Sequence, residues 1–196
     1  VGVIMVLFLF SMIFWAAFEQ APTSLNLFAS DFANRIIMGW EVPALWFQSF
    51  NSFFIITLAP LFAALWVTLS NKGIKLSSPA KFSMGLAFTA IGFLLMIFAA
   101  NIVVDGNGLI KVSAMWLIGS YFFQTVGELC LSPVGLSSMT KLAPKKLAGQ
   151  MMGVWFFGTA LGNLIAGIVG GKVNPENLQE MPQLFQQTAL SLAIAA

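Results

Sequence analysis

Two acidic residues interrupt long apolar stretches of this sequence. Glu19 lies in an apolar run that continues to about Ser30, and Glu128 is the single charge between Val112 and Thr140. A charged side chain at the centre of a lipid bilayer costs at least about 2.5–3.5 kcal/mol, so it usually faces a polar cavity, pairs with a cation or stays protonated. Both glutamates are therefore candidates for a substrate, ion or gate site. The alternative is a static ion pair that only holds helices together.

Polar and aromatic residues accompany these acids at helical spacing. Residues three or four positions apart share one face of an α-helix. Because polar faces avoid lipid, four helices with such faces could line an aqueous cavity near the membrane centre. The groups with this spacing are Trp15 and Glu19; Gln48 and Asn51; Gln124, Glu128 and Ser132; and Trp155, Thr159 and Asn163.

The chemistry of these side chains indicates what kind of solute the cavity would hold. The Glu128 carboxylate can balance an ammonium group, and the amides of Asn51 and Gln124 can both donate and accept hydrogen bonds. Trp15 and Trp155 can supply flat apolar walls or cation–π contacts. This set of groups suits a zwitterionic organic solute that carries amide groups.

The residue content argues against other functions. The chain has no His and a single Cys, Cys130, which excludes a histidine metal site, an internal disulfide and a CxxC motif. No hydroxyl or thiol stands beside a base, and there is no Gly-rich phosphate loop. We therefore predict no enzymatic activity, no bound metal and no cofactor. The net charge of +2 is spread without a basic block, which argues against nucleic-acid binding.

The composition is typical of a membrane protein. Of the 196 residues, 59% are hydrophobic and 8% are charged, whereas soluble domains average about 45–50% and about 25%. A membrane helix needs about 20 apolar residues, so we predict an all-α integral membrane protein with six transmembrane helices, the last one truncated. Both ends lie inside apolar runs, and we expect a part of a longer protein. The predicted spans are about residues 1–30, 42–71, 82–104, 112–140, 147–171 and 183–196.

The charges of the connectors predict an orientation. The second and fourth connectors contain six lysines and no acid, whereas the first, third and fifth contain three basic residues and five acids. Cytoplasmic loops carry the excess of Lys and Arg, so we expect the second and fourth connectors, and the start of the chain, on the cytoplasmic side. The six lysines are Lys72, Lys75, Lys81, Lys141, Lys145 and Lys146.

Prolines and small residues predict local features of the spans. Each proline inside a span removes a backbone hydrogen bond and permits a kink; these are Pro22, Pro60 and Pro133. A row of small residues every four positions lets another helix approach closely, and a sliding surface in a moving transporter is the alternative. That row is Gly158, Gly162, Ala166 and Gly170.

Four segments carry a resemblance that covers essentially the whole chain. They are FWAAFEQAPTSLNLFA (Phe14–Ala29), FNSFFIITLAPLFA (Phe50–Ala63), GELCLSPVGLSSMTKLAP (Gly127–Pro144) and MGVWFFGTALGNLIAG (Met152–Gly167). They resemble the proton-coupled oligopeptide transporter family of the major facilitator superfamily, whose members have two six-helix bundles. The resemblance implies that residues 1–196 form the C-terminal transmembrane bundle, helices seven to twelve of a twelve-helix transporter.

The resemblance also implies substrate-binding roles. Glu128 matches the family glutamate that receives the peptide amino terminus, and Ser132 matches a serine of the same pocket. Asn51 matches the asparagine that contacts the peptide backbone, while Trp15 and Trp155 match aromatic residues of the pocket.

A gating role follows from the same resemblance. Glu19 matches the acidic position of helix seven that pairs with an arginine of the N-terminal bundle and takes part in gating and proton coupling. Gln124, one turn before Glu128, completes the predicted substrate-binding set. Ser52 departs from the family, where many members have proline, which leaves the local bend of the second span open. The ExxER motif and the carboxylate-binding basic residues of the family belong to the other bundle.

The function that the resemblance implies is proton-coupled symport of di- and tripeptides by alternating access. Its partners would be the peptides, protons as the coupling ion, membrane lipids and the N-terminal six-helix bundle of the same transporter. The expected location is a bacterial-type inner (plasma) membrane, which the protein would cross several times. Two alternatives stay open: a related facilitator for another small solute, and a non-transporting membrane scaffold whose buried carboxylates are static.

Overall fold

The computed structural model describes residues 2–74, 76–171 and 177–196. Its α-helices are α1 (Gly2–Phe18), α2 (Asn26–Phe32), α3 (Ser49–Asn71), α4 (Ser78–Asp105), α5 (Met115–Leu142), α6 (Ala148–Gly170) and α7 (Glu180–Ala195). A π-helix spans Ala21–Leu25, and short 3-10 helices span Ala44–Gln48 and Lys145–Leu147. The two-residue strand β1 (Ala33–Asn34) pairs in parallel with β4 (Val112–Ser113), and β2 (Ile36–Ile37) pairs antiparallel with β3 (Trp40–Glu41).

The prediction of an all-helical membrane protein is confirmed. Among the described residues, four helical segments are long and apolar enough to cross a membrane: Gly2–Phe32, Ala44–Asn71, Ser78–Asp105 and Ala148–Gly170. The other two predicted spans contain α5, which has 28 residues, and α7, which has 16. Both pack along α4, but that they also cross the membrane stays a prediction.

The first predicted span is not one continuous helix. α1 ends at Phe18, Glu19 and Gln20 form a turn, and a π-helix follows before α2 begins. Pro22 explains the break, because it has no N–H to donate to the carbonyl of Phe18 and its ring crowds that turn. The backbone responds with a wider hydrogen bond, in which the Leu25 nitrogen donates to the Gln20 oxygen at 3.0 Å. Glu19 therefore lies at a break between two helices.

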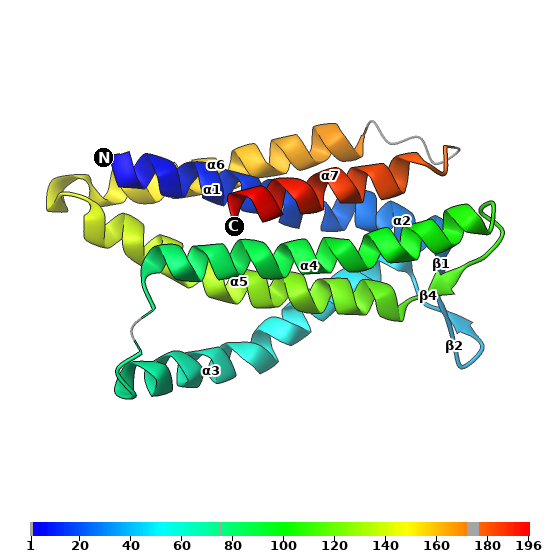
Figure 1. The fold of residues 1–196 in the computed structure, drawn as a ribbon, viewed down its shortest axis with the longest axis horizontal. Helices are drawn as coiled ribbons and strands as arrows, with labels where there is room; N and C mark the ends of the chain where they lie inside the picture. Colours follow the sequence, from blue (N-terminus) through cyan, green and yellow to red (C-terminus); the bar gives the residue numbers. More distant parts are fainter. Residues whose placement is uncertain (1, 75, 172–176) are drawn as a thin grey trace.

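The helices pack as neighbouring pairs. α4 and α5 run side by side, α7 lies along α4, and α6 lies along α1 (Figure 1). α3 diverges from the bundle while contacting α5, and none of its side chains that the structure describes is buried. α4 begins at the end of the bundle where α3 and α5 finish, and the strands lie at the opposite end (Figure 1).

An aromatic cluster forms part of the core. Phe28 of α2, Phe93 of α4 and Phe185 of α7 are fully buried. The ring centroid of Phe185 lies 5.9 Å from that of Phe28 and 6.1 Å from that of Phe93. Lipid tails are as apolar as these side chains, so the hydrophobic effect does not drive helices together within a membrane. Close packing of the kind seen in this cluster holds them together instead.

Small residues occupy the closest contacts between helices. A methyl group added at Gly162 of α6 would lie 2.5 Å from the Trp15 Cβ and 2.8 Å from the Ala16 backbone nitrogen. The predicted close approach of another helix to this row is thus confirmed, and that helix is α1. A second close contact joins α4 to α5, where a methyl group at Gly127 would lie 2.6 Å from the Gly85 carbonyl oxygen.

Candidate functional site

A polar cluster joins α3 to α5 around Glu128. The Asn51 Nδ2 of α3 donates to the Thr125 Oγ1 at 3.0 Å and to the Glu128 Oε2 at 3.4 Å. The Thr125 hydroxyl in turn donates to the Tyr121 carbonyl oxygen at 2.7 Å. Thr125 is fully buried, while Asn51 and Glu128 are half-buried. The cluster therefore fixes one carboxylate oxygen of Glu128, while the Glu128 side chain stays partly exposed.

Glu19 lies within electrostatic range of Glu128. It is half-buried at the break after α1, where its backbone nitrogen donates to the Trp15 oxygen at 2.9 Å. The exposed side-chain amide of Asn163, from α6, interacts with the Glu19 carboxylate. Three helices and the break thus bring two acids and two amides to one region of the bundle.

Trp15 and Ser132 lie beside these groups in the sequence and are half-buried. The Trp15 ring meets Phe14 and Phe18 edge-on, with centroids 5.3 Å and 5.4 Å away. Its indole N–H is buried and has no hydrogen-bond partner among the described residues. Ser132 is one turn beyond Glu128 on α5. That both extend the polar and aromatic surface around the acids stays a prediction.

Trp155 and Gln124 have different neighbours. Trp155 is 1% exposed, and its ring covers Gly135, where an added methyl group would lie 2.0 Å from the ring. Gln124 is also 1% exposed; it packs against Gly92 of α4 and donates to the Ser120 hydroxyl at 3.0 Å. Both side chains therefore fill helix interfaces in this chain, and their predicted substrate contacts stay predictions.

Thr125 is the residue of the cluster that sequence reasoning missed. It lies three positions before Glu128, so helical spacing alone places it on the same face. A threonine in a helix normally donates to the carbonyl four residues earlier. A helical threonine is therefore easily overlooked as a hydrogen-bond acceptor. Here the same oxygen accepts from Asn51.

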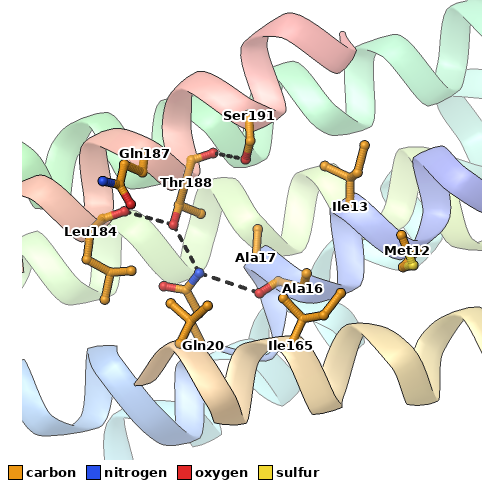
Figure 2. A pocket seen from close by; sticks show the side chains of 11 residues that line it. Met12, Ile13, Ala16, Ala17, Gln20, Ile165, Leu184, Gln187, Thr188 and Ser191 are labelled. Atoms are coloured by element: carbon orange, nitrogen blue, oxygen red, sulfur yellow. Dashed lines mark hydrogen bonds between the residues drawn. The ribbon is translucent and has the colours of Figure 1, made fainter. Parts of the chain in front are cut away.

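A cavity of about 270 Å³ lies between α1, α6 and α7, and neither Glu19 nor Glu128 lines it (Figure 2). The Gln20 side chain points into it and donates to the Thr188 hydroxyl at 3.0 Å and to the Ala16 carbonyl oxygen at 3.4 Å. Thr188 donates in turn to the Leu184 oxygen at 2.9 Å. This chain of hydrogen bonds links the break after α1 to α7.

Comparison with known proteins places the chain in a family. The sequence profile of the POT family (PTR2) matches residues 1–183. The chain belongs to the POT family. The resemblance drawn from the sequence motifs is thereby confirmed, and a POT family transporter is not an enzyme.

Relatives of this POT chain include bacterial peptide transporters. It is 49% identical over 183 residues to the peptide transporter YePEPT of Yersinia enterocolitica, covering 93% of this chain and 36% of that protein. It is 35% identical over 199 residues to dipeptide and tripeptide permease A of Escherichia coli, covering 97% of this chain and 39% of that protein.

The fold agrees with a solved POT structure. A crystal structure of a POT family transporter in complex with a thioalcohol-conjugated peptide matches 97% of this chain and 39% of its own chain, with a TM-score of 0.81 and 31% identity. The chain thus spans 36–39% of the length of these relatives. It is a multi-pass membrane protein homologous to bacterial peptide permeases.

Proposed function

We propose that this chain is the C-terminal six-helix bundle of a proton-coupled symporter of di- and tripeptides. The cluster of Asn51, Thr125 and Glu128, with Glu19 in electrostatic reach, is the observation that carries the proposal. A pair of carboxyl groups among apolar helices marks an ion or substrate pathway. The names of the relatives, a peptide transporter and a dipeptide and tripeptide permease, support peptides as the solute.

In this proposal the peptide ammonium group binds Glu128. Asn51 donates to one carboxylate oxygen, and the second oxygen is left to face the substrate. Ser132 and Trp15 extend the pocket along α5 and α1. Gln124 and Trp155 support the site indirectly, because they pack α5 against α4 and α6. The peptide carboxylate is bound by cations of the N-terminal bundle, and both bundles rock around this midplane site.

Glu19 couples the cycle to protons. Its negative charge attracts an arginine of the N-terminal bundle and closes the outer gate. Protonation removes that charge, so the gate opens, and the Asn163 amide still offers the neutral acid a hydrogen-bond partner. Binding an ammonium group at Glu128 and a proton at Glu19 each compensate one negative charge in this region of the bundle.

Replacement of Glu128 tests the substrate site. In the full-length transporter, Glu128→Gln should lower dipeptide uptake about tenfold to a hundredfold, which is the loss expected when a charge-assisted hydrogen bond becomes neutral. Uptake of labelled dipeptide into proteoliposomes, at matched protein content, is the measurement.

The matched control removes a carboxylate away from the site. Asp105 is exposed at the end of α4, and Asp105→Asn should leave uptake unchanged. Wild-type uptake by the Glu128→Gln protein would refute the assignment. Competition by unlabelled dipeptide, and none by other small solutes, should separate a peptide symporter from a related facilitator.

A further inference from the structure

A cavity of about 390 Å³ lies between α3, α4 and α5, at the end of the bundle where α4 begins. It lies apart from Glu19 and Glu128, neither of which lines it. Two lysines line it from different helices, Lys81 of α4 and Lys141 of α5. Three serines stand with them: Ser78, Ser137 and Ser138. The lining thus gathers two positive charges and three hydroxyl groups, with no carboxylate among its residues.

The charges of this cavity are not balanced within the described part of the chain. Over those residues the single salt bridge joins Arg35 to Glu41, and neither lysine takes part in it. The Lys81 Nζ lies 4.5 Å from the centroid of the Trp66 ring, a cation–π contact that positions the ammonium group without neutralising it. Within the same part of the chain, the three serine hydroxyls form no side-chain hydrogen bond. The cavity therefore offers unused donors to an anion.

The start of α4 adds to the positive potential. This helix has 28 residues, and its first residue is Ser78 at the cavity wall. The N-terminal end of a helix carries a partial positive charge. Lys141 lies in the last turn of α5, where it also offsets the negative end of that helix.

Apolar walls flank the charged centre. Ala59, Phe62 and Ala63 of α3 form one side of the cavity. A neighbouring cavity of about 300 Å³ shares Ser78, Ser138 and Lys141 with the first, and Val3 and Leu7 of α1 line it. A ligand with an anionic head and hydrocarbon chains matches this arrangement, whereas a small inorganic anion would leave both apolar walls empty.

We propose that the cavity binds the phosphate group of an anionic phospholipid. The phosphate lies between Lys81 and Lys141 and accepts hydrogen bonds from the serine hydroxyls, while an acyl chain covers the α3 wall. Two lysines near a membrane surface each strengthen binding of an anionic lipid. Because the site joins α3 to α4 and α5, bound lipid ties the diverging helix to the bundle.

Native mass spectrometry of the full-length transporter tests the proposal. Phosphatidylglycerol should remain bound at a higher activation energy than phosphatidylcholine, which has a phosphate but no net charge. The double variant Lys81→Gln/Lys141→Gln should lower the occupancy by phosphatidylglycerol about tenfold or more, from the loss of two lysine contacts. Inorganic phosphate should not displace the lipid.

Two control variants keep the test sharp. Lys72→Gln removes the same charge at the end of α3, outside the cavity lining, and should leave lipid occupancy unchanged. Lys81→Arg/Lys141→Arg should restore binding even if the Gln variant folds poorly. Equal binding of the two lipids by the wild type, or wild-type occupancy in the double Gln variant, would overturn the proposal. Displacement of the lipid by inorganic phosphate would overturn it too, in favour of a free-anion site.

Discussion

Glu19 owes its position to a proline three residues later. Pro22 ends the regular hydrogen bonding of α1, so the acid lies at a turn followed by a π-helix. π-Helical segments are rare in proteins, and those that occur are often found at functional sites. A break also lets the backbone around the acid shift without unwinding a whole helix. Such a position suits the proposed change of charge at Glu19 during transport.

The proposed coupling role of Glu19 can be tested by removing its charge. Glu19→Gln in the full-length transporter should reduce proton-driven accumulation of dipeptide strongly, while counterflow exchange of peptide is retained. The amide cannot gain or lose a proton, but exchange needs no net proton movement. Both activities are measured in proteoliposomes with and without an imposed pH gradient. Equal loss of the two would contradict a selective coupling role.

At the scale of helices, contacts between glycine and backbone decide which elements approach. α6 lies against α1 because Gly162 leaves room for the Trp15 and Ala16 backbone. The same contact brings Asn163 to Glu19, since Asn163 directly follows Gly162 and Glu19 lies three residues after Ala16. The close packing of α6 against α1 therefore also sets the positions of Asn163 and Glu19.

A glycine pair within α6 tests that interpretation. Gly162→Ala would place a methyl group 2.8 Å from a backbone nitrogen, and overpacking of this kind costs about 1–3 kcal/mol. We expect a lower Tm for the purified full-length transporter. Gly167→Ala is the matched control, because nothing lies within 4 Å of the added methyl group. It should keep or raise the Tm, and an equal decrease in both variants would argue against a specific contact.

At the scale of the whole molecule, the lysine-rich connectors lie at the end of the bundle where α4 begins. That arrangement agrees with helices that cross in alternating directions, and the excess of lysine predicts that this end is cytoplasmic. The proposed phospholipid would then belong to the inner leaflet.

Cysteine labelling measures this orientation. Leu109 is 88% exposed in the connector after α4, and Lys72 is exposed after α3, whereas the native Cys130 is fully buried. A membrane-impermeant maleimide should label Leu109→Cys in intact cells and Lys72→Cys only after the membrane is opened. The reverse pattern would invert the predicted topology.

The sequence was sufficient for the helical membrane class and the family. Long apolar runs separated by charged connectors admit few other structures, since a bilayer demands about 20 apolar residues per helix. The observed α4, Ser78–Asp105, and α6, Ala148–Gly170, lie within a few residues of the predicted spans. Helical spacing also identified the face of α5 that carries Glu128.

Only the tertiary structure decided which of the predicted residues meet. Gln124 and Glu128 share a helical face by spacing, yet Gln124 packs on α4 while Glu128 is held by Asn51 of α3. Spacing along one helix gives the direction of a side chain and nothing about which neighbour stands there. That neighbour depends on close contacts between residues far apart in the chain, such as Gly162 with Trp15 and Gly85 with Gly127.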